Sequence, residues 1–94
     1  MVHYSGEEVQ LTQAARKHRV GKARIVDVMT NPYVITELES TKGGDQRIMF
    51  LGDDHTGRAL EVVAIRQDDR CLVVHAMDLR KKFRAAYEEG RSDE

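Results

Sequence analysis

The chain has 94 residues, of which 40% are hydrophobic and 33% are charged, and its formal net charge is -1. This is too much apolar material for a disordered chain and too much charge for a membrane-embedded one, so we predict one globular domain over residues 1–94, ordered over about 9–90. No stretch approaches the roughly 20 apolar residues that cross a bilayer, and the N-terminus lacks the basic and apolar regions of a signal peptide. We therefore expect a cytoplasmic protein that has no membrane partner.

Basic side chains are concentrated in two segments. Residues 9–26 contain five Lys or Arg and no acid, and residues 79–86 contain four Lys or Arg and no acid. The net charge argues against a nucleic-acid-binding protein, because such domains usually carry a clear basic excess. The segregation of the charge nevertheless allows a local cationic surface.

The N-terminal part is predicted to begin with a short strand and a helix. Val9 and Leu11 alternate with polar residues, which is the pattern of an N-terminal edge strand. Thr12 is a suitable N-cap for a helix over residues 13–18, because its hydroxyl can accept an unpaired amide hydrogen of the first turn. Gly21 then ends this helix.

The chain next passes from a second helix into a sheet. Apolar residues recur at helical spacing over residues 22–30, and Asn31-Pro32 ends this helix because proline disfavours helical backbone in the residue before it. Residues 33–38 are rich in β-branched side chains and residues 47–51 are mostly apolar. They predict two strands joined by a glycine-containing turn over residues 40–45.

The clearest hairpin of the sequence joins residues 59–66 to residues 71–77. A turn centred on residues 68–69 places Val62 opposite His75, on one face of the sheet. Both faces of the hairpin are largely apolar and should be covered. Either the helices before and after the sheet cover both faces unaided, or a partner protein covers part of one.

Glu61 and His75 are the polar exceptions in this hairpin, and alternation places them on opposite faces. Burying an unpaired carboxylate costs several kcal/mol, so Glu61 should have a cationic partner, either Arg47 or a base of the terminal helix. His75 is open to two interpretations. It is either a structural histidine that binds backbone or a group that moves protons.

The C-terminal helix is predicted over residues 79–89, with Asp78 as N-cap and Gly90 as the closing residue. One face is apolar and the other is basic. The predicted fold is therefore α+β, with two short N-terminal helices, an antiparallel sheet of about four strands, an additional N-terminal edge strand as an option, and a C-terminal helix.

Cofactor and metal motifs are not evident in the sequence. The single cysteine, Cys71, lies in an apolar run and should be buried, and the four histidines show no paired ligand spacing. There is no glycine-rich phosphate loop and no nucleophile motif. We therefore expect neither a metal nor another cofactor.

Several short strings, taken in order, resemble a known family. They are Lys17-His18-Arg19-Val20, Asn31-Pro32, Arg47 leading into Leu51-Gly52, Gly57-Arg58-Ala-Leu-Glu-Val-Val63 and Tyr87-Glu-Glu-Gly90. Their order and spacing, which cover most of the chain, resemble the BrnT toxins of bacterial type II toxin–antitoxin systems.

This resemblance implies a RelE-like, metal-independent ribonuclease toxin that a cognate antitoxin neutralises. Its partners would be an RNA substrate and the antitoxin, in a homodimer or in a heterotetramer with the antitoxin. Such an enzyme needs a base near the attacking 2′-hydroxyl and cations around the phosphate. The residues that match these roles are His75, His18, Arg80 and Tyr87 for catalysis and Lys17, Arg47, Arg84 and Lys81 for RNA binding.

One departure from the family pattern concerns the end of the last strand. BrnT-like chains usually carry a Ser-Ala-Arg-like segment there, whereas this chain has His75-Ala76-Met77. Either Arg80 replaces the arginine, or His75 takes over part of the chemistry, or the chain is a non-catalytic interaction module of the same fold. The sequence does not indicate an RNA sequence preference.

Overall fold

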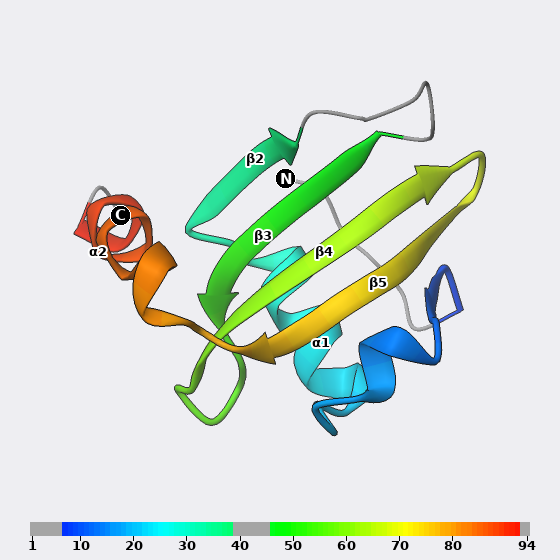
Figure 1. Cartoon of the computed structure of the whole chain (residues 1–94), viewed down its shortest axis with the longest axis horizontal. Helices are drawn as coiled ribbons and strands as arrows, with labels where there is room; N and C mark the ends of the chain where they lie inside the picture. The colour runs from blue at the N-terminus through cyan, green and yellow to red at the C-terminus, as the bar shows by residue number, and fades with distance from the viewer. Residues whose placement is uncertain (1–6, 39–45, 93–94) are drawn as a thin grey trace.

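The computed structural model describes residues 7–38 and 46–92, which form one mixed sheet flanked by two helices (Figure 1). The strand order is β1-β5-β4-β3-β2. The elements are β1 (Val9–Leu11), the 3-10 turn η1 (Ala14–Arg16), α1 (Lys22–Thr30), β2 (Val34–Leu38), β3 (Arg47–Asp53), β4 (Ala59–Gln67), β5 (Arg70–Asp78), η2 (Lys81–Phe83) and α2 (Arg84–Ser92). The turn predicted over residues 40–45 lies entirely outside the described residues.

The predicted antiparallel sheet of about four strands is wrong. The optional N-terminal edge strand is present as β1, and it makes a fifth strand that runs parallel to β5. Val9 lies opposite Cys71 in this pairing and is completely buried. Its burial supplies the stabilisation that a three-residue strand cannot obtain from local sequence. The sheet is therefore mixed, and the β1–β5 pair at its edge joins residues that are more than 60 positions apart in the chain.

The prediction of two N-terminal helices is also wrong. Residues 13–18 form only the single 3-10 turn η1, in which Ala15 is the one buried residue. A segment with so little apolar surface to bury has little tertiary support for a longer helix. The N-cap of η1 is Gln13, not Thr12 as predicted, although the Thr12 hydroxyl accepts a hydrogen bond from the Ala15 amide at 3.2 Å. The second predicted helix is present as α1, with Gly21 at its N-cap instead of at the end of a preceding helix.

The C-terminal helix is present but starts later than predicted. Arg80, not Asp78, is the N-cap of η2, and α2 continues through Gly90 to Ser92. A Cβ atom on Gly90 would lie 2.6 Å from the carbonyl oxygen of Tyr33 and 2.6 Å from a methyl group of Val34. Gly90 is therefore an interior helix residue that permits close packing of α2 on the start of β2.

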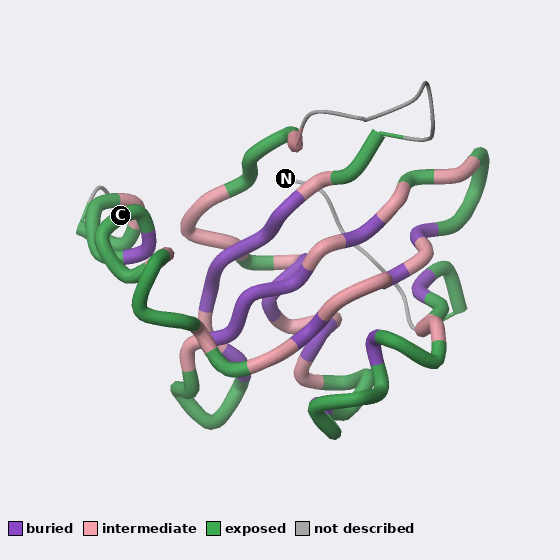
Figure 2. Tube along the Cα trace, in the orientation of Figure 1, coloured by how far each residue is buried: buried purple, intermediate pink, exposed green. Residues whose placement is uncertain are grey.

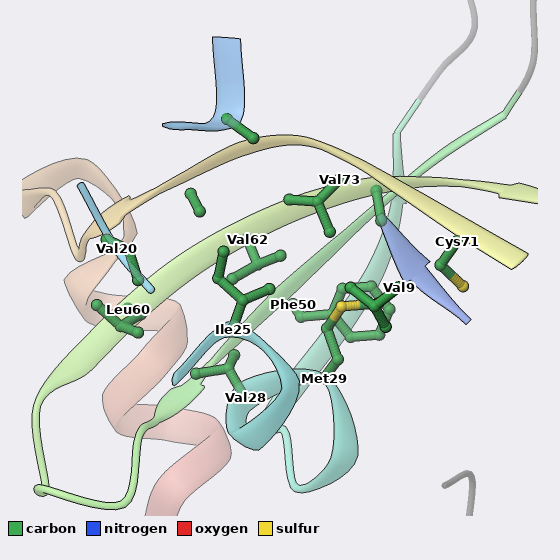
Figure 3. Close-up of a cluster of buried hydrophobic side chains, with 13 residues drawn as sticks. Val9, Val20, Ile25, Val28, Met29, Phe50, Leu60, Val62, Cys71 and Val73 are labelled. Carbon is green, nitrogen blue, oxygen red and sulfur yellow. The ribbon is translucent and has the colours of Figure 1, made fainter. Parts of the chain in front are cut away.

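One face of the sheet, which we call the closed face, is covered by α1, which lies behind the strands in Figure 1. Its side chains form an uninterrupted apolar core (Figure 3). Cys71 belongs to it and is 6% exposed, as predicted. The buried members are Val9, Ala15, Val20, Ile25, Val28, Met29, Phe50, Leu60, Val62, Ala64, Cys71, Val73 and Ala76.

The opposite face, which we call the open face, is covered at one end only. Met49, Leu51 and Tyr87 form a smaller buried cluster there, where α2 packs against β2 and β3. Figure 1 shows α2 at the left end of the sheet, and the front of β4 and β5 carries no helix of the described chain. Figure 2 shows half-buried stretches along these two strands and a mostly exposed α2. The helices therefore leave part of this face open.

Among the described residues, no helix has the length and apolar character needed to cross a membrane.

Candidate active site

A β-bulge in β5 decides which side chains reach the open face. The hairpin pairs as predicted near its turn, but the register shifts between Val63 and Ala64, so that Val63 lies opposite His75. Val74 has no partner on β4 and is the extra residue of the bulge. The predicted pairing of Val62 with His75 is wrong, because one extra residue moves all that follow it to the other face. His75 consequently lies on the open face.

Glu61, on the same face, is the polar centre of the site and is 1% exposed. Its carboxylate binds Nε2 of His75 at 2.9 Å and accepts a hydrogen bond from Nη2 of Arg80 at 2.7 Å. The backbone amide of Arg80 also donates to it, at 2.8 Å. Burial alone would raise the pKa of Glu61, but the hydrogen bonds from Arg80 and His75 outweigh burial and lower it. The carboxylate is therefore ionised, and its cation comes from the C-terminal segment, one of the two predicted sources.

The ionised carboxylate determines how the two partners can act. Since Glu61 can only accept hydrogen bonds, we assign the hydrogen of neutral His75 to Nε2, which leaves Nδ1 as a proton acceptor. The His75 side chain is 27% exposed and so is accessible to a ligand. Nε and Nη2 of Arg80 both bind Glu61, whereas Nη1 has no hydrogen bond within the described residues. The cluster thus combines one proton acceptor with one positioned cation.

A hollow of about 460 Å³ lies over this cluster. Its volume is in the range typical of small-ligand sites, roughly 300–1,000 Å³. Its lining is apolar except for a few charged or polar groups, an arrangement that can hold a flat ring and an anionic group together. The lining residues are Ala14, Leu38, Arg47, Met49, Glu61, Val63, Val74, His75, Arg80 and Phe83.

The structure brings together four of the residues predicted for the site. His75, Arg80 and Arg47 line the hollow. The ring of His18 meets that of His75 edge-on, with 6.1 Å between the ring centroids. His18 reaches this position because η1, which precedes it, packs against β5. A second imidazole therefore stands beside the first.

The other predicted residues lie elsewhere. Tyr87 is 3% exposed in the cluster beneath α2, and its hydroxyl donates a hydrogen bond to Asp53. Burial and the bond to Asp53 raise the pKa of Tyr87 to about 12, so the phenol stays protonated and engaged with that carboxylate. Three further residues are exposed and do not line the hollow, namely Lys17, Lys81 and Arg84.

A second polar cluster, centred on buried Asp54, joins the loop between β3 and β4 to α1. Asp54 accepts hydrogen bonds from Nε of Arg24, from Thr56 and from the backbone amide of Arg58. Burial would raise the pKa of Asp54, but these hydrogen bonds hold it well below its usual range. The Asp54 carboxylate is occupied by these hydrogen bonds, whereas Nη2 of Arg24 is buried without a hydrogen-bond partner among the described residues. We interpret the cluster as a structural tie. Over residues 7–38 and 46–92, no group of three His, Cys, Asp or Glu is arranged to hold a metal ion.

Glu61 is the site residue that sequence reasoning left out of the proposed machinery. Its position in an apolar strand signalled a need for a cation, either Arg47 or a base of the terminal helix, and the structure shows the second of these. The pairing with His75 was not detectable, because it depends on the bulge at Val74.

Comparison of the chain with protein-family models, with curated proteins and with solved structures finds no match.

Proposed function

We propose that this protein is the toxin component of a type II toxin–antitoxin pair, a metal-independent ribonuclease that a cognate antitoxin neutralises. The observation that carries the proposal is the Glu61–His75–Arg80 cluster at the edge of an open hollow. A buried carboxylate that orients an imidazole and a guanidinium is an arrangement suited to proton transfer beside a phosphate. The resemblance to BrnT toxins points to the same chemistry.

The geometry supports a transesterification of the RNA backbone. The 2′-oxygen attacks the adjacent phosphorus, and Nδ1 of His75 accepts the proton of the 2′-hydroxyl. The bond from phosphorus to the 5′-oxygen breaks, and protonated His18 supplies a proton to that oxygen. Arg80 and Arg47 stabilise the negative charge of the phosphate while it has five substituents. The products are a 2′,3′-cyclic phosphate and a 5′-hydroxyl.

Arg80 also accounts for the arginine that the family pattern has at the end of the last strand and that this chain lacks. Met77 occupies the position of that arginine, and it lies opposite Glu61 in the hairpin. The guanidinium of Arg80 reaches the same carboxylate from beyond the end of β5. We infer that Arg80 takes the place of the missing strand arginine.

The test is cleavage of a fluorescent single-stranded RNA by the purified chain in the presence of EDTA. We expect His75→Ala to lower kcat by about 10²- to 10⁴-fold, the usual contribution of a general base. Glu61→Gln should lower kcat less and change the pH profile, because Glu61 positions His75 without touching the substrate. The matched control is His55→Ala. His55 lies in the loop between β3 and β4, where it binds Asp27 of α1, and it does not line the hollow.

Circular dichroism would establish that each variant is folded before its rate is compared. A folded wild-type chain that leaves RNA intact, or a His75→Ala variant as active as the His55→Ala control, would rule out the nuclease proposal.

A non-catalytic interaction module is the second candidate, favoured by the uncovered part of the open face. Val63 and Val74 are half-buried and line the hollow. A binding partner would complete their burial. If this candidate is right, expression of the chain alone leaves growth and total RNA unchanged, whereas the toxin proposal requires growth arrest.

A further inference from the structure

A second hollow, of about 520 Å³, is lined in part by Arg16 of η1. Three of its lining residues are cations, Arg16, Arg19 and Lys22, and none of its lining residues is an acid. Its remaining lining residues are Gln10, Leu11, Val20 and Gly21. It is the larger of these two hollows, and the proposed chemistry does not use it.

The three cations are free to bind an external anion. All three are exposed, and none forms an ion pair within residues 7–38 or 46–92. Other arginines of the described chain, such as Arg24 and Arg80, are instead paired with buried carboxylates. Three cations that pair with no acid of the described chain surround one hollow, and their positive potential favours an anionic partner.

Residues of the turn η1 line both hollows. Ala14 lines the active-site hollow, and Arg16, two residues later in η1, lines the second one. Figure 1 shows the segment containing η1 lying along the β5 edge of the sheet. An extended anionic chain that leaves His75 across η1 would therefore reach Arg16 next.

The lining of the second hollow suits a nucleotide better than a carboxylate side chain. Val20 is 5% exposed and Leu11 is half-buried, so they form an apolar floor. Gln10 adds an amide that can both donate and accept hydrogen bonds. A nucleotide offers an anionic phosphate together with a flat, hydrogen-bonding base, whereas an acidic peptide offers mainly charge.

We propose that the hollow formed by Arg16, Arg19 and Lys22 is a second nucleotide-binding subsite, which holds the RNA strand beyond the cleavage site. This inference rests on the proposed ribonuclease function. The second hollow binds phosphates of the RNA strand, and the hollow over His75 and Arg80 carries out the cleavage.

The test measures binding without cleavage. The probe is a fluorescent 2′-O-methyl RNA dodecamer, which lacks the attacking hydroxyl, and its Kd is measured by anisotropy at several salt concentrations. For the triple variant Arg16→Gln, Arg19→Gln, Lys22→Gln we expect a Kd at least ~10-fold higher at low salt. The slope of log Kd against log salt should fall by about 2, since each single-strand phosphate contact contributes about 0.7.

A second triple variant with the same loss of charge is the control. Arg58→Gln, Arg66→Gln, Arg70→Gln removes three exposed arginines that line neither hollow. Its Kd should stay within about twofold of the wild-type value, because its residues make no phosphate contact. Equal Kd values and salt slopes for the two triple variants would overturn the subsite.

Two further measurements distinguish the RNA subsite from a site for an acidic protein, and from the ribonuclease function on which it rests. A poly-glutamate dodecamer that binds more tightly than the RNA, with the same dependence on the three cations, would assign the hollow to an acidic protein partner and overturn the RNA subsite. Wild-type chain that binds the dodecamer through the three cations but leaves unmodified RNA intact would contradict the ribonuclease function, while supporting the nucleotide subsite. Failure of the two proposals is therefore distinguishable.

Discussion

The closed and open faces of the sheet differ in the residues that one strand, β4, supplies to each of them. On the closed face, β4 contributes Leu60 and Val62, both completely buried beneath α1. On the open face, the intervening residues of that strand are Glu61 and half-buried Val63, next to a hollow. Strand alternation thus separates a side that stabilises the fold from a side that is free to carry charge.

The separation explains how a chain of this size can bury a carboxylate. A domain near 100 residues buries only about two-thirds of the surface that its unfolded chain exposes, so its core is small. Here most of the buried apolar residues lie on the closed face, and Glu61, on the open face, obtains its hydrogen bonds from Arg80 and His75. The β-bulge at Val74 brings His75 to this face, and bulges recur next to active sites for this reason.

The largest expected effect comes from making the same substitution in two adjacent residues, one on each face of the sheet. Val62→Ala removes two methyl groups from a fully buried site, and we expect it to lower the free energy of unfolding by about 2 to 3 kcal/mol. Val63→Ala makes the same change on the open face, where we expect a loss of about 1 kcal/mol or less. Urea denaturation followed by circular dichroism measures both. Equal losses would mean that the two faces do not differ in their contribution to stability.

The same contrast separates what the sequence could predict from what it could not. The limits of α1 and of the β4–β5 hairpin follow from local patterns, namely helical spacing before Asn31-Pro32 and apolar runs on either side of an Asp-Asp turn. The parallel pairing of β1 with β5 is a long-range contact that no local pattern specifies. The extra residue Val74 was undetectable for the same reason, because it ends a run of three apolar residues, Leu72, Val73 and Val74, in which either register buries similar side chains.

The candidate site was predictable in its residue types and less so in its geometry. His75 and Arg80 were expected to act near the end of the last strand, and the structure joins them through Glu61. Tyr87 was expected to act with them, but helical spacing could not show that its hydroxyl binds Asp53 under α2. A residue type suggests a chemistry, whereas tertiary contacts decide whether the group is accessible.

An intermediate effect is expected where α2 covers the end of the open face. Gly90→Ala would normally stabilise a helix interior by roughly 1 kcal/mol. Here the added Cβ would lie 2.6 Å from the backbone of Tyr33 and from Val34, so we expect a net loss of about 1 to 2 kcal/mol. Ala86→Gly, at an exposed position of the same helix, is the control for helix propensity alone and should cost about 1 kcal/mol. A gain in stability for Gly90→Ala in urea denaturation would show that α2 does not pack closely on β2.

The smallest expected effect is a difference in pH dependence that isolates Glu61. Its pKa in the folded chain lies below the ordinary value of about 4.5, so its contribution to stability is present above that value and is lost as the pH falls through the folded pKa. Asp54, in the loop between β3 and β4, follows the same sign, because its hydrogen bonds also hold its pKa well below the usual range. Glu61→Gln cannot titrate, so its free energy of unfolding should decline less than that of the wild-type chain between about pH 6 and pH 3. Urea midpoints measured across this range would show the two curves converging as the pH falls. Parallel curves would mean that Arg80 and His75 do not stabilise the ionised carboxylate, and the open face would then lack the charge that sets it apart from the closed one.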